Sequence, residues 1–209
     1  STLIGPEPGY ALFTSALFFL FGESNTLARF WPAVFGSLLV LAPILFRRPL
    51  GKLPAVLFAF ALALDPGLAA LSRQAGGATW AIAGLTLTAG FLLNRAVVPA
   101  GIFLGLALLG GPAVWFGLLA VIISGGLWWL LSPVEQRSGW RDRAFSLATL
   151  SWRTFWLWAV GIFLLGGSLF FFAPGGISAA AASFTTFFHS WGGPAELAPV
   201  SVVMAVAGY

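Results

Sequence analysis

The sequence predicts an all-α membrane protein, a polytopic bundle of transmembrane helices. Of 209 residues, 59% are hydrophobic and only 8% are charged, whereas a soluble domain carries roughly a quarter charged residues. The apolar residues also occur in runs of about twenty, the length that crosses a hydrocarbon core of roughly 30 Å. So few charges could not cover a water-facing surface. We therefore expect residues 1–209 to form a single transmembrane domain with lipid as its solvent.

Breaks between the apolar runs define the expected helices. Residues 9–21 are apolar but too short to cross comfortably, so they predict a juxtamembrane or re-entrant helix. The polar segment Gly-Glu-Ser-Asn-Thr at 22–26 ends this helix. About six spans are expected after it, each closed by charged residues, Gly or Pro. They lie near 28–46, 54–71, 78–93, 96–109, 112–131 and 154–172.

Three further segments complete the predicted topology. The polar and basic stretch 132–153 predicts a cytoplasmic loop. The stretch 174–199 is rich in Gly, Ala and Ser, and it predicts a long outer loop. Residues 200–209 predict the start of a further helix.

The Lys and Arg residues predict how the spans are oriented. Strict alternation of the spans places eight basic residues on one side and two, Arg29 and Arg73, on the other. The positive-inside rule makes the side with eight the cytoplasmic one. Glu7, Arg29, Arg73 and the 174–199 loop should then share the outer face of a multi-pass protein of the bacterial inner membrane. The eight inner residues are Arg47, Arg48, Lys52, Arg95, Arg137, Arg141, Arg143 and Arg153.

Composition and motifs exclude several classes of protein. Without Cys there is no disulfide framework and no thiolate metal site. A single His cannot build a multi-histidine metal site, and no P-loop, Rossmann or zinc-protease motif is present. The basic residues lie at helix ends, where lipid headgroups explain them better than nucleic acid. We expect membrane lipids, and no nucleic acid, among the partners.

Glu7 is the candidate catalytic residue. It lies between Pro6 and Pro8, which stiffen the backbone and expose its carboxylate near the outer interface. A carboxylate there could act as a base or bind a divalent metal. The alternative is an acidic residue in a solvated lead segment.

Arg29 and Arg73 are the candidate phosphate-binding residues, because a guanidinium near a helix end favours anions. The alternative for Arg29 is an interfacial side chain that snorkels towards water. Asp65 precedes Pro66, which should bend or end the helix there. Arg73, eight residues later, is the candidate ion-pair partner of Asp65 if the chain stays helical. Gln74 and the lone His189 are candidate supporting residues, although a loop His among aromatics is more often interfacial.

Small and aromatic residues have structural interpretations. Gly101 and Gly105 match the GxxxG pattern, which allows helices to pack closely. Tryptophans near the expected inner interface suit an aromatic belt. These are Trp128, Trp129, Trp152, Trp156 and Trp158.

An ordered series of short motifs runs from about residue 5 to residue 95. The members are Leu20-Phe21-Gly22, Ser24, Arg29, Pro32, Phe35-Gly36, Arg47-Arg48, Leu50-Gly51, Asp65-Pro66 and Ser72-Arg73. This order resembles the polytopic glycosyltransferases of the GT-C type. The likeness is closest to the branch that contains protein mannosyltransferases and aminoarabinose transferases.

The resemblance implies transfer of a sugar from a polyprenyl-phosphate carrier at the outer membrane face. In such enzymes an acidic residue in the first outer loop serves as base or metal ligand. That loop would precede Ser1, and Glu7 does not align with the usual acidic pair. We therefore expect either part of a larger enzyme, lacking the first helix and the acidic loop, or a relative without catalysis.

Three functions remain open at this point. The leading hypothesis is the core of a GT-C-like glycosyltransferase or a homologue of one. The second is a non-catalytic accessory or scaffold subunit of a larger membrane complex, which scarce polar groups and abundant small residues favour. The third is a transporter or flippase, which needs a polar path near the midplane. The spans offer little for such a path beyond Thr79, Thr86, Thr88 and Ser124.

Overall fold

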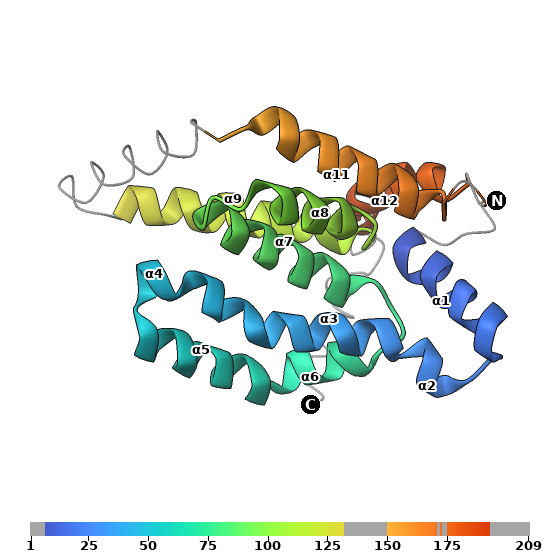
Figure 1. The fold of residues 1–209 in the computed structure, drawn as a ribbon, viewed down its shortest axis with the longest axis horizontal. Coiled ribbons are helices and arrows are strands. Elements are labelled where there is room, and N and C mark those ends of the chain that lie inside the picture. Colours follow the sequence, from blue (N-terminus) through green and yellow to red (C-terminus); the bar gives the residue numbers. More distant parts are fainter. Residues whose placement is uncertain (1–6, 132–149, 171, 173–174, 193–209) are drawn as a thin grey trace.

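The computed structural model describes residues 7–131, 150–170, 172 and 175–192. Every regular element in this part of the chain is a helix, so the all-α prediction is confirmed. Most of the helices run along the long axis of the molecule, and α1 lies obliquely at one end (Figure 1).

The first helix, α1 (Pro8–Phe21), confirms the helix expected at 9–21. Pro8 fits the first turn because its missing N–H would be unpaired there in any case. The helix ends at Gly22, whose φ of +82° suits a residue without a Cβ. Ser24 then caps the short helix α2 (Asn25–Ala28) by accepting a hydrogen bond from the Leu27 N–H.

The second apolar run forms α3 (Phe30–Leu41), the 3₁₀ segment η1 (Ala42–Phe46) and α4 (Arg47–Leu50). Pro43 donates no backbone hydrogen bond, which accounts for the irregular turn at η1. The Asn94 side-chain amide donates to the Leu45 carbonyl at 2.7 Å and ties η1 to the end of α7.

The predicted span 54–71 is not one continuous helix. It is a pair, α5 (Lys52–Leu64) and α6 (Pro66–Arg73), bent by 57°. The bend falls at Asp65-Pro66, as the sequence predicts, because a residue before proline is disfavoured in the helical region. Asp65 has a ψ of 117° there, and its carboxylate accepts from the Leu68 N–H at 2.7 Å.

The next runs form α7 (Ala78–Leu93), α8 (Val97–Leu108), α9 (Ala113–Leu131) and α11 (Trp152–Gly167). The first three agree with the expected boundaries to within a residue. Helix α11 stops earlier than the predicted Phe172, and Leu169 and Phe170 have positive φ after it. Of the predicted loop 132–153, residues 132–149 lie outside the described part, and Trp152 and Arg153 belong to α11.

The prediction of a long loop at 174–199 is wrong for most of its length, because α12 spans Gly175–Gly192. Four consecutive alanines at 179–182 are strong helix formers. The helix also buries Ala179, Ala180 and Ser183, and it contacts α1, α9 and α11. Small residues are typical of loops, but here they provide a close-packing helix face. Residues 193–209, including the expected further helix, lie outside the described part.

Helix α7 is central and contacts α3, α8, α9 and η1. Its Trp80 is almost fully buried and packs on Phe35, with ring centroids 4.4 Å apart. Trp31 and Phe13 also contact this ring, so α1, α3 and α7 share one aromatic core.

By length and composition, two helical stretches among the described residues could cross a membrane: Phe30–Leu50 and Ala113–Leu131. The bent pair α5–α6 could be a third. This finding is compatible with an integral membrane protein. The expected number of about six spans is not confirmed, because α7 and α8 have only 16 and 12 residues. At 1.5 Å per residue they measure about 24 and 18 Å, less than the roughly 30 Å of a hydrocarbon core.

The two ends of the molecule differ in composition. At one end the Gly9 N–H donates to the Leu109 carbonyl, and the Glu7 carboxylate accepts from the Gly77 N–H. We call this the Glu7 end. At the opposite end, η1 contacts the end of α7 and leads into α4, which Figure 1 shows at this end of the molecule. We call it the basic end, because it carries Arg47, Arg48, Lys52 and Arg95.

Candidate functional site

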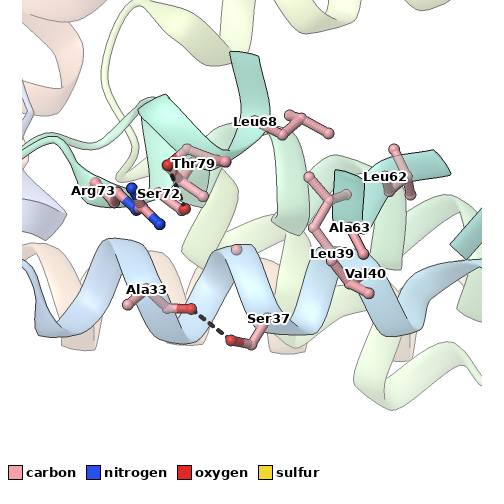
Figure 2. A pocket seen from close by; sticks show the side chains of 12 residues that line it. Ala33, Ser37, Leu39, Val40, Leu62, Ala63, Leu68, Ser72, Arg73 and Thr79 are labelled. Carbon is pink, nitrogen blue, oxygen red and sulfur yellow. Dashed lines mark hydrogen bonds between the residues drawn. The ribbon is translucent and has the colours of Figure 1, made fainter. Parts of the chain in front are cut away.

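A cavity of about 310 Å³ lies between α3, the bent pair α5–α6 and the start of α7. Its polar lining and its apolar lining are at opposite ends (Figure 2). Arg73, Ser72 and Thr79 form the polar end. The apolar end consists of Leu39, Val40, Leu62, Ala63 and Leu68. We call this space the α3–α6 cavity.

The bend at Asp65 gives the cavity its shape. A straight helix would carry residues 66–73 onward along the axis of α5, whereas the 57° bend turns α6 relative to α5. The Asp65 carboxylate holds the new helix start by capping the Leu68 N–H. Asp65 therefore supports the site through the backbone and not through an ion pair. Arg73 forms no ion pair with any residue that the structure describes.

Gly36 brings α3 close to α6 at the polar end. A Cβ at this position would lie 2.7 Å from the Cβ of Ser72, closer than real Cβ contacts occur. Ala33, Gly36, Ser37 and Val40 follow one face of α3 and all line the cavity. The small side chains on this face leave the open volume.

Each hydroxyl group of the cavity lining donates a hydrogen bond to a backbone carbonyl. Ser37 donates to the Ala33 carbonyl at 2.9 Å, as Figure 2 shows, and Ser72 donates to the Ala69 carbonyl at 3.0 Å. Thr79 donates to the Leu71 carbonyl at 3.2 Å. The guanidinium of Arg73, with five N–H donors, is thus the group of this lining suited to an anion.

Glu7 lies outside this cavity but close to the turn that follows Arg73. Its Oε2 accepts from the Gly77 N–H at 2.8 Å, at the start of α7. A carboxylate there is favoured by the free N–H groups and by the helix dipole. No residue that the structure describes hydrogen-bonds to Oε1. Oε2 of Glu7 therefore has a structural contact, and Oε1 has no hydrogen-bond partner among the described residues.

The other predicted site residues are dispersed. Arg29 is exposed between α2 and α3 and is not part of the cavity lining. Gln74 ends α6, and its backbone N–H donates to the carbonyls of Ala70 and Leu71. His189 is exposed in the last turn of α12. The structure thus brings Arg73 into a cavity and leaves Arg29 and His189 outside it.

Ser37, Ser72 and Thr79 were not predicted as members of the site. The signal for Ser37 was the small residues at i, i+3 and i+4 from Ala33 to Ser37, which define a helix face. Thr79 could be placed only once α6 was known to contact the start of α7, where the Thr79 hydroxyl donates to the Leu71 carbonyl.

The described part of the chain contains no set of side chains suited to binding a divalent metal. No group of three or more His, Cys, Asp or Glu side chains is assembled there. Hard cations take roughly six oxygen ligands or more, often with several waters. Glu7 alone, with one oxygen already bound to a backbone N–H, does not amount to such a site.

Comparison with protein-family models, curated proteins and solved structures finds no significant match to this chain.

Proposed function

We propose that the chain is the core of a GT-C-like membrane glycosyltransferase, or a homologue of one. In this proposal it is a multi-pass protein of the bacterial inner membrane, with the Glu7 end at the outer face. The α3–α6 cavity would hold the phosphate of a polyprenyl-phosphate sugar on Arg73. The observation that carries the proposal is the cavity lining, with a guanidinium at one end and aliphatic side chains at the other.

The size and chemistry of the cavity suit a lipid phosphate. Ligand pockets usually have volumes of roughly 300–1,000 Å³, and 310 Å³ accommodates a headgroup and the first part of a tail but not a whole polyprenyl lipid. The remaining tail would continue along the end of α5, whose Leu64 is exposed. A charge-assisted contact between Arg73 and phosphate would contribute about 1.5–3 kcal/mol.

Glu7 has a defined place in this proposal. Its Oε1 could accept a proton while Oε2 stays bound to the Gly77 N–H. The backbone contact would hold the carboxylate in one orientation near the turn after Arg73.

A second candidate function is an accessory or scaffold subunit of a larger membrane complex. The contact between Glu7 and Gly77 favours it, because this contact gives the carboxylate a structural role without any chemistry. Helix α9 also favours it, since its residues 121–123 are all exposed and apolar. Such a face is covered by lipid or by another membrane helix.

The Arg73→Gln variant tests the first proposal. It removes the charge but keeps a hydrogen-bonding side chain of similar length, so polyprenyl phosphate should bind at least tenfold more weakly. Binding is measured by native mass spectrometry of the full chain in detergent. Arg48→Gln, at the basic end, is the matched control and should bind as the wild type does.

Three outcomes separate the candidates. Equal loss in both variants would mean that only total charge matters, which contradicts a site at Arg73. Unchanged binding by Arg73→Gln would exclude the phosphate role. No binding by the wild type, together with a stoichiometric membrane partner after co-purification, would favour the scaffold function.

A further inference from the structure

A second cavity of about 370 Å³ lies at the basic end and shares no lining residue with the α3–α6 cavity. It is formed by η1, α4 and the first turns of α5. Arg47 and Lys52 supply its charged groups, and Ile44, Val56 and Phe60 supply its apolar wall. We call it the basic groove.

The turn between α4 and α5 places the two cations together. Gly51 has a φ of +91°, a left-handed conformation that favours glycine. Its N–H donates to the Arg47 carbonyl at 3.0 Å, which closes the turn. Arg47 before the turn and Lys52 after it therefore line the same groove.

The charges of the groove are not neutralised by any residue of the described ranges. Arg47 and Lys52 form no ion pair with any described residue. The acidic residues of the described ranges are Glu7, Glu23 and Asp65. Glu7 and Glu23 belong to the Glu7 end, and Asp65 follows the far end of α5. An anion in the groove would meet two cations and no nearby carboxylate from this part of the chain.

The wall of the groove is apolar and open. Ile44 and Val56 are each 52% exposed and Phe60 is 62% exposed. Ala55 is buried at the base of the groove, and Ala59 adds only a methyl group. A ligand that fits has a negative headgroup and a hydrocarbon chain.

We propose that the basic groove is a binding site for an anionic phospholipid of the cytoplasmic leaflet. The phosphate lies between Arg47 and Lys52, and one acyl chain covers Ile44, Val56 and Phe60. Charge complementarity selects this occupant, since anionic headgroups collect where basic residues flank membrane helices. The site is independent of the proposed transferase function, because it shares no residue with the α3–α6 cavity.

Native mass spectrometry of the full chain in detergent, titrated with phosphatidylglycerol or phosphatidylcholine, tests this proposal. Phosphatidylglycerol should bind more tightly. One cation near an anionic surface contributes about a fivefold change in affinity, so Arg47→Gln and Lys52→Gln should each weaken phosphatidylglycerol binding by about that factor. The control is Arg48→Gln, because Arg48 is exposed on the same short helix but does not line the groove. It should change the affinity by less than twofold.

A second variant tests the acyl-chain contact. Ala59→Phe fills the apolar wall and leaves both cations in place, so it should weaken phosphatidylglycerol binding without altering the charge. Free inorganic phosphate at equal concentration should not compete. Equal affinity for both lipids, an Arg48→Gln loss as large as that of Arg47→Gln, or competition by inorganic phosphate would each overturn the proposal.

Discussion

Glu7 shows how one half-buried contact can organise a helix end. Gly77 is the N-cap residue of α7, and its N–H has no intrahelical acceptor, so the Glu7 carboxylate supplies one. The same end is closed by the Gly9 N–H, which donates to the Leu109 carbonyl. A Cβ on Gly77 would lie 2.8 Å from the Gly110 carbonyl oxygen, so the chain approaches here backbone to backbone. Glu7 thus links α1 to the start of α7 across 70 residues.

Glu7→Gln should therefore destabilise the fold. The amide oxygen can still accept from Gly77, but the negative charge at the helix N-terminus is lost, which costs about 1 kcal/mol. Thermal unfolding in detergent measures the change. Glu23→Gln is the control, because Glu23 is exposed and its side chain bonds to no described residue.

If Glu7 is also the base of a transferase, Glu7→Gln should lose most of the transferase activity although it loses only about 1 kcal/mol of stability. A stable Glu7→Gln protein with full activity would leave Glu7 with the structural role alone. An unfolding temperature equal to that of wild type would contradict even that role.

At the scale of elements, glycines determine the closest helix packing. Helix α8 lies against α11 through Gly101 and Gly105, the GxxxG pair of the sequence. A Cβ on Gly101 would lie 2.5 Å from the Phe155 carbonyl oxygen, and one on Gly105 would lie 2.6 Å from that of Ala159. Backbone packing of this kind permits weak Cα–H···O contacts. The interpretation of GxxxG as a close-packing face is confirmed.

Gly101→Ala should lower the stability of the fold, whereas Gly161→Ala should not. The methyl group at 101 must push α11 away, which costs about 1–3 kcal/mol. At 161 a Cβ meets nothing within 4 Å, so the better helix propensity of Ala leaves stability unchanged or raises it by up to about 1 kcal/mol. Unfolding of both variants in the same detergent gives the comparison. Equal effects would mean that α8 and α11 do not pack as described.

At the scale of the whole molecule, charge is divided between the two ends. The described acidic residues lie away from the cluster Arg47, Arg48, Lys52 and Arg95. The contact of Asn94 with Leu45 places Arg95 near this cluster, although the two segments are far apart in sequence. The cluster of Lys and Arg at one end is what the positive-inside rule expects of the cytoplasmic end of a membrane protein.

Single cysteines should report this division directly, because the natural chain contains no Cys. In intact bacterial cells, Gln74→Cys should react with an impermeant maleimide, whereas Arg48→Cys should react only after the membrane is opened. Both side chains are exposed, so access to the thiol does not limit the reaction. Labelling of both positions in intact cells would refute the orientation, and with it the outer-face site at Arg73.

The sequence by itself determined the helical class, the boundaries of α7, α8 and α9, and the bend at Asp65-Pro66. These features follow from local causes: apolar composition, Gly and Pro at breaks, and the conformation that proline imposes on its neighbour. Arg73 was also identified locally, as a cation at a helix end. The sequence did not reveal α12, because small residues suit both loops and close-packed helices.

Only the tertiary structure decided which polar groups meet. Asp65 caps α6 and forms no pair with Arg73, and Glu7 bonds to Gly77. Neither partner can be found from spacing along one helix, since one contact depends on a bend and the other joins segments 70 residues apart. The cavity beside Arg73 likewise exists because α6 is bent by 57° from α5 and Gly36 lets α3 approach it. Side chains separated in sequence acquire a shared environment only when packing fixes the angle between their helices.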